Sequence, residues 1–313
     1  MSGEVGKSMS REDADRCEKQ IAATEAISAE THDLDTLSTD ALVALLAREQ
    51  RTALSALETA VPSLARAVDA IVERLRKGGT LHYAGAGSSG RLGMLDAAEC
   101  PPTFGTPPSL VRAHIAGGAE ALSRAVEGAE DDAAAGEAEA RRGVQASDAV
   151  VGISASGGAP WVVAWIRTAR EIGALTIALT SDASSALAAA AEMPIFMETG
   201  AEPIAGSTRL IAGTAQKLAL NAISTATMVR LGKVYDNLMV DVVATNEKLH
   251  RRALRLVCLL ADVDQSAAAA LLESAGGSVK IAVVMSRRGL DAAAARALLD
   301  RQGDFLRQCF EPG

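Results

Sequence analysis

A Gly/Ser-rich segment, GAGSSG at residues 85–90, has the composition of an anion-binding loop. It follows a short apolar run, residues 81–84, and precedes a helical pattern over residues 91–98, so the expected order is strand, loop, helix. Free backbone N–H groups and the helix dipole favour anions at a helix N-terminus. We therefore expect Gly87, Ser88 and Ser89 to bind a phosphate group through N–H groups and hydroxyls.

The same segment fits two better-known nucleotide loops poorly. It is not a P-loop, because no Gly-Lys-Ser/Thr follows it. It matches G-x-G-x-x-G, but no acidic residue ends the next expected strand, residues 110–115, where a ribose would need one. Any tight strand-to-helix turn uses Gly and Ser, so this segment alone is a weak signal.

A second segment of the same kind, SASGG at residues 154–158, precedes Pro160 at an expected helix start. We expect Ser154, Ser156 and Gly157 to contribute to the same phosphate site. A single Gly/Ser loop is explained by an ordinary strand-to-helix turn. Two such loops in one sheet favour an anion-binding site.

Two sets of carboxylates could supply acid–base catalysis. Glu99 precedes Pro101-Pro102, where we expect the helix to stop, in apolar surroundings that suit an uncharged general acid. The second set is an acidic run formed by Glu127, Glu130, Asp131 and Asp132. Acidic runs are mostly solvated helix faces, so chemistry alone does not choose among these residues.

Further charges lie in residues 200–246, which start polar and become helical from about residue 210. Glu202, Arg209 and Lys217 stand in or beside apolar sequence, where a buried charge needs a partner or a ligand. A solvent-facing row is the default interpretation of such charges. From this region we expect additional substrate contacts by Glu202, Ser207, Thr208 and Lys217.

The composition limits the class of partner. The chain has 313 residues, 49% hydrophobic and 22% charged, enough to bury a large core, and its net charge of -8 argues against nucleic acid. Four cysteines lack C-x-x-C spacing and four histidines form no ligand pair, so we expect no metal. Without an export segment or a long apolar span, we expect a cytoplasmic protein that does not bind membranes.

Alternating apolar and helical patterns predict an α/β architecture. Strands are expected at residues 81–84, 110–115, 149–153, 175–179 and 193–196, and helices at residues 120–130, 160–171 and 183–191. Such alternation produces a parallel sheet covered on both faces, with ligands at the carboxyl ends of the strands. Two helices divided near Pro62 are expected over residues 40–77, and a small helical bundle after residue 248.

Four sequence blocks resemble the N-acetylmuramic acid 6-phosphate etherases, of the sugar isomerase (SIS) fold superfamily. They are YAGAGSSGRLGMLDAAECPPTFG, AVEGAEDD, GSTRLIAGTAQKLALN and GKVYDNLMVDVVATNEKL. The similarity extends from about Thr24 to near the carboxyl end. It implies an SIS-type parallel five-stranded sheet covered by helices on both faces. The implied divisions are a flexible lead-in (1–20), a helical segment (21–70), a phosphosugar-binding domain (71–234) and a UBA-like helical bundle (250–313).

The resemblance implies that the chain converts N-acetylmuramic acid 6-phosphate to N-acetylglucosamine 6-phosphate and D-lactate in cell-wall amino-sugar recycling. It also implies a homodimer without metal or redox cofactor. The family's two functional glutamates correspond to Glu99, in DAAECPP, and Glu130, in EGAED. Eliminating lactate needs a base at C2 and an acid at the departing oxygen. We assign Glu99 as the acid and Glu130 as the base, although the resemblance does not settle which residue does which.

A straight helix would separate Glu99 from a phosphate at Ser89 by about 15 Å, more than the distance from phosphate to C3 in a hexose phosphate. Either the helix breaks near Gly93 or a second subunit completes the site. We favour a symmetric dimer with shared active sites.

The chain departs from the family pattern at three positions. Gly158 and Ala159 replace the usual Arg and Thr of the second loop, and Ile211 stands where Lys is common. We expect weaker side-chain contact with phosphate in that loop, while both glutamates are kept.

Two other functions share the expected fold. One is a non-catalytic phosphosugar-binding regulator similar to the glucokinase regulatory protein, and the other is an aldose–ketose isomerase. Fold alone does not separate them, but the presence of both Glu99 and Glu130 favours the etherase.

Overall fold

The computed structural model describes residues 23–242 and 247–311, so the expected lead-in at residues 1–20 lies outside the described residues. The centre of the molecule is a parallel five-stranded sheet in the order β2-β1-β3-β4-β5. The strands are β1 (Leu81–Gly85), β2 (Val111–Ile115), β3 (Ala149–Ile153), β4 (Leu175–Thr180) and β5 (Met193–Phe196). All five strands predicted from apolar runs are confirmed. Strands β1, β3 and β4 are buried along their whole length, so their sequences show no polar alternation, whereas the edge strands β2 and β5 are partly exposed.

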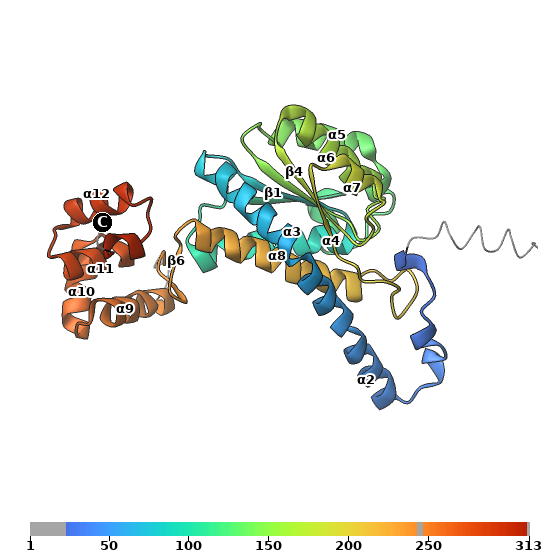
Figure 1. Cartoon of the computed structure of the whole chain (residues 1–313), viewed down its shortest axis with the longest axis horizontal. Helices are drawn as coiled ribbons and strands as arrows, with labels where there is room; N and C mark the ends of the chain where they lie inside the picture. Colours follow the sequence, from blue (N-terminus) through green and yellow to red (C-terminus); the bar gives the residue numbers. More distant parts are fainter. Residues whose placement is uncertain (1–22, 243–246, 312–313) are drawn as a thin grey trace, which may run out of the picture.

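Helices cover both faces of the sheet, as Figure 1 shows. One face carries α3 (Arg51–Arg76), α4 (Gly87–Phe104) and α8 (Ile211–Arg230), and the other carries α5 (Ala133–Gly143), α6 (Pro160–Ile172) and α7 (Ala186–Ala190). Successive residues of a strand point to opposite faces of the sheet. Val151 packs in the cluster under α3 and α8, whereas Val150 packs with α6. The layered α/β fold is thus confirmed.

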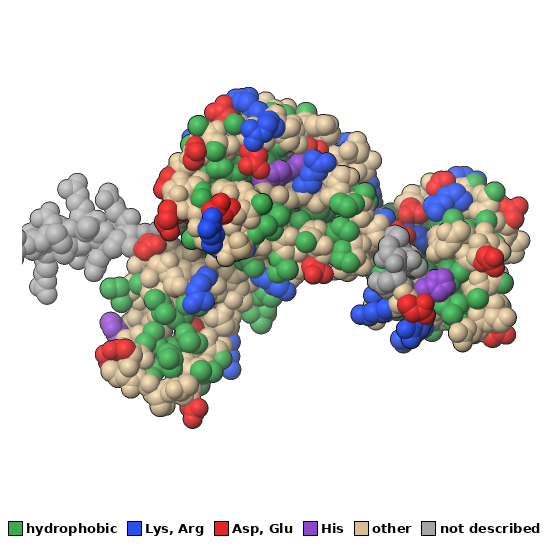
Figure 2. Space-filling view, turned by 180° about the vertical axis from the view of Figure 1, so that it is seen from behind, with side chains coloured by type: hydrophobic (Ala, Val, Ile, Leu, Met, Phe, Trp, Pro, Cys, Tyr) green, Lys and Arg blue, Asp and Glu red, His purple; other side chains and the backbone are tan. Residues whose placement is uncertain are grey.

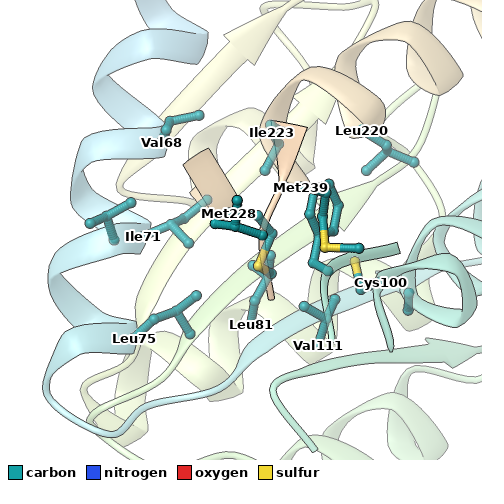
Figure 3. Packing of buried hydrophobic residues seen from close by; sticks show 14 of the residues in the cluster. Val68, Ile71, Leu75, Leu81, Cys100, Val111, Leu220, Ile223, Met228 and Met239 are labelled. Carbon is teal, nitrogen blue, oxygen red and sulfur yellow. The ribbon is translucent and has the colours of Figure 1, made fainter. Parts of the chain in front are cut away.

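The larger core lies between the sheet and the layer of α3, α4 and α8. Figure 3 shows Val68, Ile71 and Leu75 of α3 directed toward Leu220 and Ile223 of α8. Burial of such aliphatic side chains contributes about 1.5–3 kcal/mol each. The core therefore holds α4 and α8 against the sheet.

Two expected helix boundaries were wrong. The break between α2 (Thr39–Glu49) and α3 falls at Gln50, whose side chain accepts a hydrogen bond of 2.7 Å from Thr214, and α3 continues through the exposed Pro62. Helix α4 also continues through Pro101 and Pro102 to Phe104. In both helices, buried apolar residues on each side of the proline positions keep the helix packed, although each proline lacks the N–H that would donate a backbone hydrogen bond.

The helix expected at residues 120–130 is absent. Two 3-10 turns, η4 (Gly118–Leu122) and η5 (Ala129–Asp131), occupy this region, and α5 begins only at Ala133. Gly117, Gly118 and Gly128 have positive φ there, which interrupts a regular helix. The Asp132 side chain accepts the N–H of Ala135 at 2.9 Å and so caps α5.

The chain leaves the sheet at both ends. Residues before α3 form η1 (Ala23–Glu25), η2 (Ala29–Thr31), η3 (Leu34–Thr36) and α2, which extend as an arm away from the sheet. Figure 2 shows hydrophobic side chains gathered on this arm, where Ile27 and Val43 are exposed. The boundary expected at residue 70 falls inside α3.

After α8, a short hairpin leads to a separate helical bundle (Figure 1). The hairpin is β6 (Val234–Tyr235) with β7 (Leu238–Met239), and the bundle comprises α9 (Glu247–Ala261), α10 (Gln265–Ser274), α11 (Val279–Arg288), α12 (Ala292–Arg301) and η6 (Arg307–Cys309). Within residues 23–242 and 247–311, no single helix is long and apolar enough to cross a membrane. Only α10 and α11 taken together have the required length and composition, and they are bent by 110°.

Candidate active site

A cavity of about 390 Å³ opens at the carboxyl ends of β1 and β3. These strands are neighbours, and the chain leaves them toward opposite edges of the sheet, which is where open α/β sheets bind ligands. The walls come from four segments brought together by the fold. They are Ala86, Gly87, Ser88, Ser89, Glu130, Asp131, Ile153, Ser154, Ala155, Ser156, Gly158, Ala159, Pro160 and Thr208.

The first loop is shorter than expected, because α4 already begins at Gly87. No side chain caps this helix, so its first N–H groups remain available to a ligand at the cavity. The strand and helix meet closely: a Cβ on Gly85 would lie 2.7 Å from Gly90 N, and one on Gly90 would lie 2.6 Å from Ile115 Cγ1. Glycine at both positions therefore lets the helix N-terminus stand directly over the strand end.

The second loop is held in shape by its own hydroxyls. Ser154 Oγ accepts the N–H of Gly157 at 3.1 Å, and Ser156 Oγ accepts the N–H of Gly158 at 3.3 Å. Gly157 has φ +65°, and a Cβ there would collide with Ser185. Gly157 itself lies behind the cavity wall, so it shapes the loop, while Ser154 and Ser156 line the cavity.

Both helix N-termini point at one cavity, and we call the two loops together, residues 86–89 and 154–160, the phosphate cradle. Helix α6 begins at Pro160, as the sequence predicted. No side chain caps this helix, and its dipole acts on the cavity together with that of α4. The cradle contains hydroxyls and N–H groups but no Lys or Arg among the residues that line the cavity. An anion held there is therefore bound by neutral donors and helix dipoles.

Two carboxylates face the cradle. Glu130 and Asp131, in the turn η5, line the same cavity, whereas Glu127 of the acidic run does not. A carboxylate beside a phosphate site is repelled by the bound anion, so its presence calls for a chemical rather than an electrostatic explanation. The position suits a base acting on the part of a ligand that extends from the phosphate.

Glu99 lies elsewhere in the single chain. It is exposed near the C-terminal end of α4 and does not line the cavity that holds Glu130. The helix is continuous through Gly93, so the break offered as one explanation of the distance is absent. The apolar surroundings expected for Glu99 are likewise absent in one chain, because its side chain faces solvent.

The remaining expected contacts divide between the cavity and its surroundings. Thr208 lines the cavity, whereas Ser207 does not. Glu202 is buried, with its two carboxylate oxygens accepting the N–H groups of Ile211 at 2.8 Å and Ala212 at 2.9 Å. Glu202 therefore anchors the N-terminus of α8, a role favoured by the helix dipole.

A buried carboxylate that the sequence did not single out lies beneath the site. Asp96 of α4 accepts hydrogen bonds from Tyr83 (3.0 Å), Asn221 (2.8 Å) and Ser224 (3.1 Å). Burial raises the pKa of Asp96, while these three hydrogen bonds and the charge of Lys217 act in the opposite direction. The network links β1, α4 and α8, and the side-chain amide of Asn221 takes part in it by donating to Asp96.

Sequence reasoning also missed Gln216. Its side chain is buried, and its Oε1 accepts a hydrogen bond of 2.8 Å from Ser89 of the cradle. Its Nε2 has no hydrogen-bond partner within the described part of the chain. Only the contact of α8 with α4 identifies this residue, since nothing in its sequence spacing marks it.

Known proteins match the chain over nearly its whole length. A Deinococcus radiodurans protein named N-acetylmuramic acid 6-phosphate etherase is 50% identical over 295 residues, covering 93% of this chain and 95% of that protein. The chain belongs to the N-acetylmuramic acid 6-phosphate etherase family. A second etherase of this family, from Symbiobacterium thermophilum, is 51% identical over 85% of this chain and 89% of its own. The resemblance seen in the four sequence blocks is thus confirmed.

The model of the glucokinase regulatory protein N-terminal SIS domain matches residues 63–170 of this etherase-family chain. This segment contains both loops of the phosphate cradle together with Glu99 and Glu130. The SIS-type fold is therefore confirmed. Among solved structures, a phosphoheptose isomerase from Francisella tularensis aligns with a TM-score of 0.48 at 20% identity, covering 61% of this chain and 98% of that one.

Proposed function

We propose that this protein removes D-lactate from N-acetylmuramic acid 6-phosphate and releases N-acetylglucosamine 6-phosphate. One observation carries the proposal: a single cavity combines a phosphate cradle with the carboxylate of Glu130, the residue that matches a functional glutamate of the family. Relatives with that activity in their name match over most of the chain. The cytoplasmic recycling of cell-wall amino sugars is the setting that we expect for it.

The chemistry follows from placing the phosphate in the cradle. Ser88, Ser89, Ser154 and Ser156 hold the phosphate, and the sugar extends toward Glu130. Once the ring opens, C1 is an aldehyde and the C2 proton becomes acidic. Glu130 takes that proton, the C3–O bond breaks, and lactate leaves after its ether oxygen receives a proton. Addition of water to the resulting unsaturated aldehyde restores a hydroxyl at C3.

The acid that protonates the departing oxygen is assigned to Glu99. Ser88, Leu92, Leu95 and Glu99 recur on one face of α4, because residues 11 positions apart (99 − 88) come back to nearly the same side after about three turns. We call this the α4 row. Its two ends are about 16 Å apart, too far for one sugar phosphate to touch both.

Glu99 of a second copy of the chain can reach the cavity despite this separation within one chain. If two α4 rows pack antiparallel about a two-fold axis midway between Leu92 and Leu95, Glu99 of the second copy comes to lie beside Ser88 of the first. Leu95 is 50% exposed in the single chain, which is unusual for a leucine at the centre of a row and suits such a contact. We therefore propose a homodimer in which each site uses Glu130 of one copy and Glu99 of the other.

The activity is tested directly with the purified protein and N-acetylmuramic acid 6-phosphate. D-lactate is measured with a coupled dehydrogenase, and the sugar product by mass spectrometry; N-acetylglucosamine 6-phosphate serves as the control that releases no lactate. Equal amounts of D-lactate and N-acetylglucosamine 6-phosphate support the proposal. Binding without lactate would indicate a phosphosugar-binding regulator, and a ketose phosphate without lactate would indicate an isomerase; either result contradicts it.

A further inference from the structure

A second cavity, of about 470 Å³, adjoins the phosphate cradle and shares Ser88 with it. Arg91, Leu92 and Leu95 of α4 form one wall, and Arg209 and Lys217, before and within α8, form the other. We call it the basic cavity. It begins one turn along α4 from the phosphate-binding end, on the same helix face as the α4 row.

The charges of the basic cavity are not compensated by the protein. It contains three cationic side chains and no carboxylate among its lining residues. Neither Arg209 nor Lys217 forms an ion pair with any described residue, and the Arg91 guanidinium donates only to the carbonyl of Arg124, at 3.2 Å. A chain with 39 acidic and 31 basic residues has carboxylates available for pairing, so three unpaired cations in one cavity indicate an external anion.

The nearest internal carboxylate does not fill this role. Asp96 follows Leu95 on α4 and is 5% exposed. Its oxygens accept hydrogen bonds from Tyr83, Asn221 and Ser224, and Lys217 affects it only through its charge. The cations therefore remain directed to the open cavity.

The division of charge between the two cavities matches a ligand with two anions. The cradle binds phosphate with neutral donors, and the basic cavity presents full positive charges about one helical turn away. A lactyl ether on C3 of a sugar 6-phosphate carries its carboxylate at the opposite end from the phosphate, next to a methyl group. Arg and Lys suit the carboxylate of such a ligand.

We propose that Arg209 and Lys217, supported by Arg91, form the subsite that binds the free carboxylate of the lactyl group. This inference rests on the proposed function and specifies which part of the substrate the second cavity recognises. The subsite makes a free lactyl carboxylate a requirement, so a substrate whose lactyl group is an amide, as in a peptide conjugate, is discriminated against. In the proposed dimer, Glu99 of the second copy reaches the ether oxygen between the two cavities.

The test combines protein variants with a change in the substrate. Arg209→Met and Lys217→Met are compared with Arg167→Met, which removes an exposed, unpaired arginine from a different cavity that meets the cradle at Gly158 and Pro160. For each protein, kcat/KM is measured for N-acetylmuramic acid 6-phosphate and for its lactyl carboxamide. The inhibition constant of N-acetylglucosamine 6-phosphate, which lacks the lactyl group, and the Tm are measured in parallel.

The wild-type protein and Arg167→Met should prefer the acid over the amide at least tenfold. In Arg209→Met and Lys217→Met, kcat/KM for the acid should fall tenfold or more while that for the amide and the inhibition constant change less than twofold. Equal losses for acid, amide and product would overturn the subsite, because the cations would then act on the phosphate. A wild-type protein that turns over neither substrate would contradict the proposed function instead, and the two failures are thereby distinguished.

Discussion

The hydroxyl of Ser89 donates a hydrogen bond of 2.8 Å to Oε1 of Gln216, so the phosphate cradle is joined to α8 through one buried side chain. Helix α8 also carries Lys217 of the basic cavity at the next position. A shift of α8 against α4 would therefore move the phosphate donors and the proposed carboxylate subsite together.

Replacing Ser89 by alanine should weaken phosphate binding. Because Ser89 donates its one hydroxyl proton to Gln216 and so fixes the start of α4 at the phosphate cradle, and because a neutral hydrogen bond contributes about 0.5–1.5 kcal/mol, Ser89→Ala should raise KM for N-acetylmuramic acid 6-phosphate about two- to tenfold, with a smaller effect on kcat. Ser55→Ala, which removes an exposed hydroxyl from α3, is the matched control. An unchanged KM for the Ser89 variant would remove this residue from the phosphate site.

Mixing two inactive variants should restore activity if the sites are shared. Glu99→Ala and Glu130→Ala homodimers should each lose at least a hundredfold in kcat, as expected for the loss of a general acid or base. After subunit exchange, each heterodimer contains one site with both glutamates, so statistical mixing should recover about a quarter of wild-type activity. Recovery should follow the time course of subunit exchange. No recovery, despite proven exchange, would place both glutamates in one chain's site.

The roles of the two glutamates can be separated by solvent exchange. In deuterium oxide, a base at C2 exchanges the C2 proton even when lactate does not leave. We expect Glu99→Ala to keep exchange at C2 and Glu130→Ala to abolish it, as followed by proton NMR. The opposite pattern, exchange lost in Glu99→Ala and kept in Glu130→Ala, would reverse the assignment.

Stability should decrease in mild acid because of a buried histidine. His82 is 1% exposed and contacts His114 Nε2 at 3.0 Å and Asp148 Oδ2 at 3.3 Å, while His114 also contacts Glu139. Burial, followed by the charges of His114 and Arg112, lowers the pKa of His82 from 6.5 to about 4, against the opposing effect of Asp148.

The folded state thus binds fewer protons than the unfolded state between pH 4 and 6.5. The free energy of unfolding should therefore rise by about 3 kcal/mol at most as pH increases across this window. The same contribution should be lost as pH falls through the window. Urea unfolding at pH 7 and pH 4.5 measures the difference. His82→Phe should reduce it, while His32→Gln, at an exposed site, should leave it unchanged. An equal difference in the free energy of unfolding between pH 7 and pH 4.5 for the wild-type protein and both variants would contradict the assignment of the pH dependence to His82.

The docking of the C-terminal bundle should depend on Lys280. This residue is 2% exposed, and its Nζ lies 2.9 Å from Asp241 Oδ1 and 2.6 Å from Asp304 Oδ2. Lys280→Met leaves both carboxylates without their shared cation and should lower the free energy of unfolding by about 3 kcal/mol. Lys233→Met, which removes a more exposed partner of Asp241, should cost less than about 1 kcal/mol. Equal losses in calorimetry or urea unfolding would show that burial of Lys280 is unimportant.

The sequence by itself determined the sheet and the two loops. Five apolar runs became five strands, and SASGG before Pro160 became a loop before a helix, because these features depend on local burial patterns and turn chemistry. It also singled out Glu130 through the match of its acidic run to the family, and this residue lines the cavity with the two loops. Sequence reasoning failed at Pro62 and Pro101, where packing overrides local preference, and at the segment 120–130, where glycines with positive φ interrupt the expected helix.

Only the tertiary structure decided which side chains share a cavity. Glu130 meets Ser88 and Ser154 because η5 lies over the ends of β1 and β3, whereas Glu202, equally prominent in the sequence, is used to anchor α8. The basic cavity likewise joins Arg91 to Lys217 across two helices. A sequence pattern indicates the local environment of residues that are close along the chain. The distance between residues that are remote in sequence depends on how the helices pack on the sheet, and no local pattern encodes that distance.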